Sequence, residues 1–352
     1  MSEPNFVPTT LDMTRVMDRL NGVPCDPSLL LPATYTHVAI AGTGTYGDVH
    51  FCLQNSALLS ARSGLTASTD RSAAYEKLIK QLVAIKICCE PDSIKTLQTE
   101  HEALRTIRTY KKTEDGETCG ELFALLGHGQ CFDGSSPYIV TSTLPIVCTL
   151  ESLKSSLLVL PEVFTWLIYN KLTSALHWLE DTCTPGITHG DMHSGNVLVG
   201  YPSLHSTDSL PEIKLIDFGR ALLQPPPPYT PAALIRYEQS LRADQTHFLR
   251  ILGRLVGVDV DRPGRLVRSE SPEDRGWEWC DLKMEVQDLL GMGEWDRMDE
   301  VGKMRGRWDR LAEARVQDVK AKDVEQIWDV VVGVTQGKRD EVRVKIEELL
   351  YG

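Results

Sequence analysis

The sequence predicts an α+β protein with an antiparallel sheet in its N-terminal part and mainly helices in its C-terminal part. Up to residue 144, short runs of β-branched and aromatic residues alternate with turn residues, which is typical of antiparallel strands. From residue 145, apolar residues recur at the intervals of amphipathic helices. With 352 residues, 42% of them hydrophobic, the chain can bury a sizeable core across one two-lobed unit or two small domains.

Four segments follow from these patterns. Residues 1–33 are interpreted as a leader with a short helical patch at 11–20. The sheet-bearing part covers 34–144 and contains a Ser-, Ala- and Thr-rich insertion at 54–80, helical near 73–79. The helical part covers 145–260, and 261–352 is expected to be a helical extension of it.

Individual elements can be placed within these segments. Two strands joined by a glycine-rich turn are expected between Thr36 and Leu53, followed by strands at 82–87, 122–126 and 138–141. Helices are expected at 93–109, 161–179 and 241–255. The run Pro225 to Pro228 must be an extended connector because proline breaks helices. Near the C-terminus, one apolar stripe is expected to pack against the helical part: Val324, Ile327, Trp328 and Val331.

Composition narrows the functional classes. The formal net charge of −12 argues against broad binding of nucleic acid phosphates. The N-terminus lacks the pattern of a secretory signal, and no apolar run is long enough to span a bilayer, so a location in the cytoplasm or nucleus and no membrane partner are expected. The nine cysteines include no CxxC motif of the kind that binds zinc or forms a redox dithiol, which indicates free thiols.

The first chemical motif is a glycine-rich turn with Gly42, Gly44 and Gly47 followed by Val49. Dinucleotide-binding folds use the same glycine spacing, but they need a helix after the third glycine. Here residues 49–53 continue as a strand. The turn is therefore interpreted as a lid over a triphosphate, whose backbone amides can approach phosphate oxygens.

A lysine follows in the next strand, Val83-Ala84-Ile85-Lys86. Taken alone, Lys86 could be an edge residue whose ammonium reaches solvent. After the glycine hairpin, it is better explained as the group that holds the α- and β-phosphates, oriented by an acidic residue on the following helix. Glu100 is the predicted partner, since Leu104 one turn later would face the core, and Glu102 is the alternative.

The third motif is the run His189-Gly190-Asp191-Met192-His193-Ser194-Gly195-Asn196, with Asp217-Phe218-Gly219 downstream. Asp191 would accept the proton of an attacking hydroxyl, while Asn196 and Asp217 would hold Mg²⁺. A transition-metal site is the alternative explanation of the two histidines, although no HExxH helix or paired cysteines accompany them.

These motifs occur in the order found in the protein-kinase-like superfamily, which the chain resembles from Thr36 to Leu255. The resemblance implies a bilobal protein-kinase-like fold that binds ATP and Mg²⁺. It implies Thr141 as gatekeeper and Ser142 to Leu144 as the hinge beside adenine. The apolar walls around the purine would be Val49, Ala84 and Leu198. Asp244 would anchor the catalytic loop, or else be an ordinary helix N-cap.

The chain departs from typical eukaryotic protein kinases at two positions of the loop. Gly190 replaces their arginine and His193 replaces their lysine, so the loop is similar to that of aminoglycoside and choline phosphotransferases. No Ala-Pro-Glu follows Asp217. The glycine loop, Lys86 strand and Asp-Phe-Gly motif are closer to protein kinases.

The predicted activity is transfer of the γ-phosphoryl group to a hydroxyl, with a protein serine or threonine as the first choice of acceptor. A small-molecule hydroxyl kinase and a nucleotide-binding pseudokinase scaffold are the alternatives.

Overall fold

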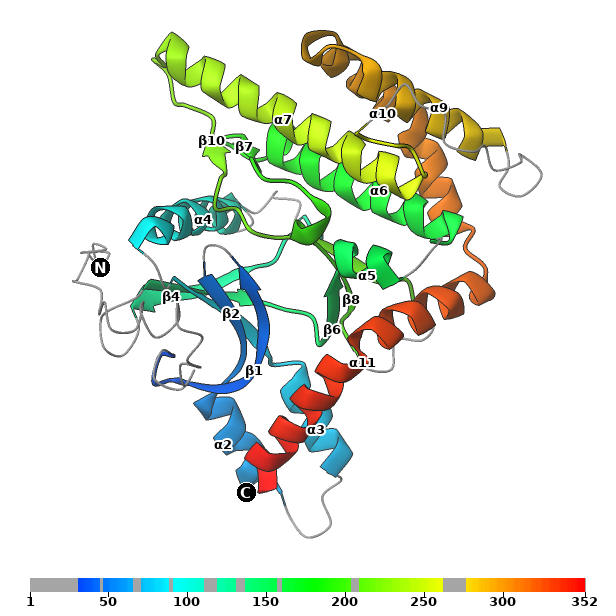
Figure 1. Cartoon of the computed structure of the whole chain (residues 1–352). Coiled ribbons are helices and arrows are strands. Elements are labelled where there is room, and N and C mark those ends of the chain that lie inside the picture. Colours follow the sequence, from blue (N-terminus) through cyan, green and yellow to red (C-terminus); the bar gives the residue numbers. More distant parts are fainter. Residues whose placement is uncertain are drawn as a thin grey trace.

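The computed structural model describes residues 31–44, 47–65, 71–88, 91–110, 119–130, 137–156, 160–203, 209–261 and 277–351. The predicted leader up to residue 30, with its helical patch, and residues 45–46 of the glycine turn lie outside the described residues. The predicted α+β class is confirmed: a five-stranded antiparallel sheet adjoins a largely helical part (Figure 1).

The five-stranded sheet has the order β1-β2-β3-β5-β4, with every neighbouring pair antiparallel. Its strands are β1 (Tyr35–Gly44), β2 (Gly47–Gln54), β3 (Val83–Ile87), β4 (Leu125–Gln130) and β5 (Pro137–Ser142). The strand predicted at 122–126 is present, but its bounds are shifted, because β4 begins only at Leu125. Leu122 is instead buried and forms an isolated bridge with Leu215, outside this sheet. Its apolar side chain serves the core between the two parts of the molecule.

The insertion contributes two helices, α2 (Asn55–Ser63) and α3 (Arg71–Ile79). The second was predicted. The first was not, since its serine-rich sequence favours a loop on composition alone. Leu58 and Ala61, one turn apart, are buried in a small core together with Leu53 of β2. Tertiary packing of this face stabilises the helix.

Helix α4 (Pro91–Tyr110), which was predicted, packs against β4 and β5 of the sheet. The helical part contains α5 (Leu150–Ser156), α6 (Glu162–His177), α7 (Pro231–Leu255), α9 (Trp277–Gly291) and α10 (Glu294–Gln317). Helix α7 begins ten residues before the prediction, after Thr230, whose hydroxyl accepts a hydrogen bond from Ala233 N. Its first turns are mostly exposed, so no apolar stripe marks them in the sequence. The proline run lies outside helices and strands, as expected.

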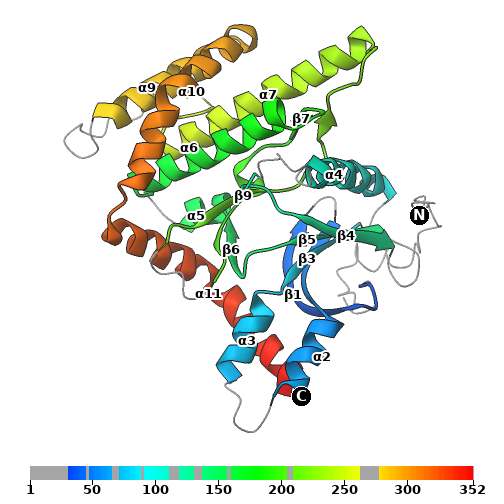
Figure 2. The same cartoon turned by 180° about the vertical axis from the view of Figure 1, so that it is seen from behind.

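The last helix, α11 (Ala321–Tyr351), joins the two parts of the molecule (Figures 1 and 2). Its predicted stripe does pack on the helical side, where the Trp328 ring lies 4.6 Å from that of Tyr201. Its last turns instead join the small core of β1, β2, α2 and α3 through Val342, Ile346 and Leu350. Residues 261–352 were expected to extend the helical part. Helix α11 also packs on the sheet-bearing part, which that expectation did not include.

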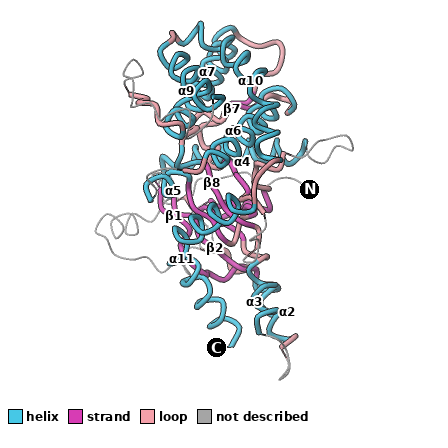
Figure 3. The backbone as a smooth tube through the Cα atoms, turned by 90° about the vertical axis from the view of Figure 1, so that its right-hand side faces the viewer, coloured by secondary structure: helices cyan, strands magenta, loops and turns pink. Residues whose placement is uncertain are grey.

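Two smaller sheets complete the fold; Figure 3 shows β8 next to the large sheet and β7 among the helices. One has the order β6-β8-β9 and consists of β6 (Ile146–Thr149), β8 (Val197–Tyr201) and β9 (Glu212–Leu215). The other pairs β7 (Ile187–Thr188) with β10 (Leu222–Leu223). They frame the loop that carries Asp191. Among the described residues, no helix is both long and apolar enough to cross a membrane.

Candidate functional site

The two short ladders hold two loops side by side. In the ladder of β8 and β9, Val197 pairs with Leu215, so Asn196 and Ile216 are neighbours and Ile216 N donates to Asn196 O at 3.0 Å. The ladder of β7 and β10 closes the other ends. Loop 189–196 and loop 216–221, far apart in sequence, are thereby fixed against each other.

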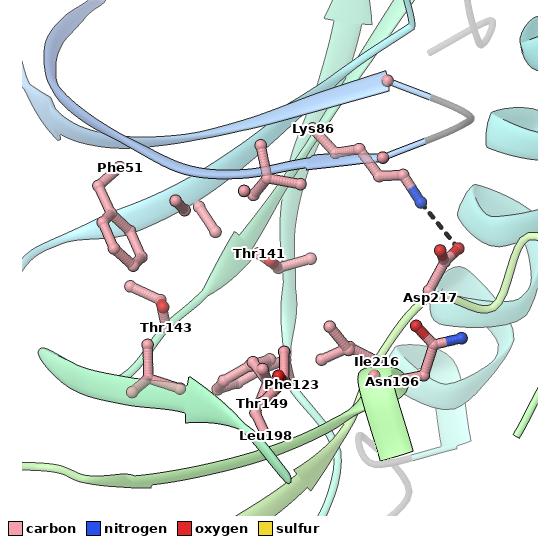
Figure 4. Close-up of a pocket in the computed structure, with 18 of the residues that line it drawn as sticks. Phe51, Lys86, Phe123, Thr141, Thr143, Thr149, Asn196, Leu198, Ile216 and Asp217 are labelled. Atoms are coloured by element: carbon pink, nitrogen blue, oxygen red, sulfur yellow. Dashed lines mark hydrogen bonds and ion pairs between the residues drawn. The ribbon is translucent and has the colours of Figure 1, made fainter. Parts of the chain in front are cut away.

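Lys86 joins the sheet to the second of these loops. Its ammonium Nζ lies 2.7 Å from Glu100 Oε2. It also lies 2.8 Å from Asp217 Oδ1, the contact drawn in Figure 4. The predicted contact between Lys86 and Glu100 is confirmed, and the alternative, Glu102, is exposed to solvent. The glutamate is buried on α4, so the lysine is positioned from two sides.

The charges of this cluster are tightly coupled. Burial raises the pKa of Glu100, although the Lys86 ammonium opposes the shift. Burial also tends to raise the pKa of Asp217, but attraction to Lys86 outweighs it and the pKa is lowered. Asp217 adopts φ 65°, a left-handed conformation that non-glycine residues seldom occupy. Such a backbone is maintained by its surroundings and is common at functional sites.

Asn196 connects both loops at the cavity. Its amide Nδ2 donates to the backbone oxygen of Asp191 at 2.9 Å, and its carboxamide oxygen lies on the cavity side (Figure 4). This oxygen and the carboxylate of Asp217 are the hard oxygen ligands that Mg²⁺ prefers. The two residues predicted to hold the metal are thus brought together and have fitting chemistry.

Asp244 anchors the loop from below. Its two carboxylate oxygens accept hydrogen bonds from the backbone nitrogens of His189, at 2.6 Å, and Gly190, at 2.8 Å. The residue lies in the middle of α7, so the N-cap alternative is wrong. Burial raises the pKa of Asp244 to about 7, against the effect of the two N–H donors. The predicted anchoring contact is confirmed.

His189 is a structural member of this network. Its Nε2 lies 2.8 Å from the backbone oxygen of Ile216, and its Nδ1 accepts a hydrogen bond from Asp191 N at 3.2 Å. This pattern requires the neutral ring, and burial lowers the pKa of His189 to about 4. Both ring nitrogens are occupied. In the described part of the chain, no group of three or more His, Cys, Asp or Glu side chains could hold a metal, which leaves the transition-metal alternative unsupported.

Gly190 explains the missing arginine of the loop. It adopts φ +75°, and a Cβ at this position would overlap the backbone oxygen of Arg220. Only glycine meets both demands. Arg220 itself was not predicted, yet its Nη1 lies 3.6 Å from Asp191 Oδ1. Its position directly after the Asp217-Phe218-Gly219 motif was the one feature of the sequence that could have indicated a place near Asp191.

A cavity of about 320 Å³ opens beside Lys86, in the volume range of small-molecule sites. Predicted residues that line it are Gly42, Gly44, Gly47, Val49, Ala84, Lys86, Glu100, Thr141, Asn196, Leu198 and Asp217. The sequence missed other lining residues, among them Phe51, Phe123, Thr143, Val147, Ile216 and Lys338. Lys338 comes from α11, and no motif could have indicated it.

Two predicted residues do not line this cavity. Ser142 accepts a hydrogen bond from Ala124 N through its hydroxyl, and Leu144 is buried in the core. The reason is the alternation of side chains along an extended chain, which turns Thr141 and Thr143 toward the cavity and their neighbours away. The side chains of Ser142 and Leu144 are thus turned away from the cavity, and hydrogen bonding of adenine by the backbone of residues 142–144 stays a prediction.

Asp191 faces a second, smaller cavity of about 200 Å³. Its walls include His193 from the same loop and His247, Arg250 and Arg254 from α7. None of these was predicted as a wall of the site. Asp191 therefore lines the smaller cavity and Asn196 the larger one, and the hydrogen bond from Asn196 to the Asp191 backbone joins the two walls.

No known protein-family profile matches the chain, and no curated protein sequence is significantly similar to it.

Proposed function

We propose that this chain is an ATP- and Mg²⁺-dependent phosphotransferase of the protein-kinase-like superfamily, with a bilobal fold, that moves a γ-phosphoryl group to a hydroxyl. One observation carries the proposal. Lys86 is paired with Glu100 and Asp217 at the end of an apolar cavity, and Asn196 links that cavity to Asp191.

The larger cavity suits a nucleotide. Val49, Ala84 and Leu198 offer apolar surface for a base, and Gly42, Gly44 and Gly47 line the cavity without side chains, which would let phosphates approach their backbone. Lys86 would bind the α- and β-phosphates, with Glu100 fixing its position. Asn196 and Asp217 would hold Mg²⁺, and ATP with this metal supplies the phosphoryl group and offsets its negative charge.

Asp191 would act on the acceptor. Its loop is fixed by Asp244, His189 and Asn196, so its carboxylate has a defined position at the second cavity. A hydroxyl bound there could transfer its proton to the Asp191 carboxylate as its oxygen attacks phosphorus. Positioning and charge then provide most of the catalysis.

A protein serine or threonine is the acceptor that we favour. The wall of the second cavity carries Arg250 and Arg254, which would repel cationic alcohols of the aminoglycoside or choline type. A pseudokinase scaffold is less well supported, since the lysine, both aspartates and the asparagine needed for chemistry are all in place.

Transfer of label from γ-labelled ATP, with Mg²⁺ and generic acceptor proteins, tests the proposal. Asp191→Asn should reduce the transfer rate by about a hundredfold to ten-thousandfold, the usual contribution of a general base. Asp281→Asn, at an exposed position of α9, is the matched control and should leave the rate unchanged. Equal rates for Asp191→Asn and the wild type, or no transfer by the wild type, would contradict the proposed function.

A further inference from the structure

The second cavity has a basic wall opposite Asp191. Arg250 and Arg254 are exposed and lie four residues apart on α7, so both guanidinium groups project from the same face of the helix. Neither forms an ion pair with a carboxylate within the described ranges of the chain. Their positive charge is therefore available to a bound ligand.

Further groups add to this positive charge. Burial lowers the pKa of Lys154 of α5, and the positive charge of the nearby Arg254 lowers it further. His247 lines the cavity, and its buried Nδ1 has no hydrogen-bond partner in the described structure. Burial and then Arg250 lower the pKa of His247, while Asp191 opposes the shift.

The carboxylates that face this region are few. Asp191 already has Arg220 within 3.6 Å. Glu151 of α5 is not among the residues that line the cavity, and its Oε2 would be 3.0 Å from a Cβ at Gly195. Asp244 is buried beneath the loop and uses both oxygens on backbone donors. None of these carboxylates neutralises the two arginines.

We infer that the second cavity binds an anionic group, a carboxylate or a phosphate, carried by the same molecule as the acceptor hydroxyl; this rests on the proposed function. Arg250 and Arg254 hold the anion, and the hydroxyl beside it lies at Asp191. Guanidinium groups suit this task because they bind carboxylates and phosphates through two parallel hydrogen bonds. The acceptor is thus either a serine or threonine next to an acidic residue, or a small phosphorylated alcohol.

Binding, measured without ATP, tests the inference independently of catalysis. Two probes are fluorescent peptides in which a serine is flanked by aspartates or, in the neutral control, by asparagines. The third probe is glycerol 3-phosphate, whose binding is measured by calorimetry. We expect the full chain to bind an anionic probe at least about tenfold more tightly than the neutral peptide, because hydrogen bonds to charged groups are strong. Added salt should weaken that preference.

Variants of the two arginines identify the site. Arg250→Gln combined with Arg254→Gln should remove the preference for the anionic probe, and the double replacement by lysine should retain only part of it. Arg236→Gln is the matched control, since Arg236 is an exposed arginine of the same helix outside the cavity. Far-ultraviolet circular dichroism and denaturation midpoints establish that each variant is folded.

The outcomes separate the two sources of the anion. A preference for the acidic peptide that depends on both arginines supports a protein acceptor, and one confined to glycerol 3-phosphate supports a small phosphorylated acceptor. No preference in the wild type, or one that the double glutamine variant keeps, overturns the inference. Label transfer from ATP is measured in parallel, so a chain that binds the anion but transfers nothing contradicts the proposed function alone.

Discussion

The two cavities on either side of the Asp191 loop differ in how their charges are balanced. In the larger cavity, Lys86 lies between Glu100 and Asp217, with little exposure to solvent. In the smaller one, Arg250 and Arg254 are exposed and have no carboxylate partner among the described residues. The first region is internally balanced and positioned in advance, whereas the second leaves its charge to be balanced by a ligand. This difference predicts different consequences when a cation is removed from each.

The largest effect is expected for Lys86→Met. This change leaves the buried Glu100 and the half-buried Asp217 without their shared cation, and breaking a buried ion pair from one side costs about 3–5 kcal/mol. Urea denaturation at pH 7 should show this loss in the free energy of unfolding. Adding Glu100→Gln to the variant should recover part of it, since one of the uncompensated charges is then removed.

Arg250→Gln provides the comparison on the other side. We expect a change within about 0.5 kcal/mol, as for other surface substitutions. Similar losses of stability for Lys86→Met and Arg250→Gln would remove the contrast between the cavities.

For Gly190→Ala, in the loop between the cavities, we expect a loss of stability smaller than that of Lys86→Met. A left-handed backbone costs alanine about 1–2 kcal/mol, and the overlap with the Arg220 carbonyl adds a packing cost of similar size. The loop should shift, so label transfer should fall while ATP affinity stays nearly constant. Gly302→Ala, at an exposed helical position with open space around it, should leave both quantities unchanged. If Gly190→Ala instead lowered ATP affinity and left label transfer unchanged, Gly190 would serve the larger cavity and the prediction would be contradicted.

The last effect concerns His189 and the pH dependence of stability. Its pKa is about 4 in the folded chain, against 6.5 for an unperturbed histidine, so it stabilises the fold above pH 6.5 and this contribution is lost as the pH falls toward 4. From pH 7 to pH 5, the wild type should lose about 2 kcal/mol relative to His189→Gln. Asp244 titrates in the opposite sense, which is why the comparison with the variant is needed. Parallel stability curves for both proteins would show that His189 is not held neutral.

The sequence predicted what depends on short spacing. Gly42, Lys86, Asp191, Asn196 and Asp217 fall in runs whose strand or loop context fixes where each side chain lies, and the structure brings the last four together. Glu100 could be chosen over its neighbour because helical spacing puts it on the face of the core.

The remainder of the site depends on contacts between distant segments. Lys338 reaches the larger cavity only because α11 returns to the first sheet, and Arg250 faces Asp191 only because Asp244 ties α7 to the loop. Neither position belongs to a local pattern. Along the extended segment 141–144, side chains alternate in direction, so Thr141 and Thr143 line the cavity while those of Ser142 and Leu144 point away from it.

Calorimetric titration of ATP into the chain, with and without Mg²⁺, tests the central claim most directly. If Asp217 and Asn196 hold the metal beside a nucleotide on Lys86, Mg²⁺ should tighten ATP binding by at least about tenfold, or roughly 1.4 kcal/mol. Asp217→Asn should abolish this gain, while Asp281→Asn should preserve it. A wild-type chain that binds no ATP, or binds it equally well without the metal, would contradict the account.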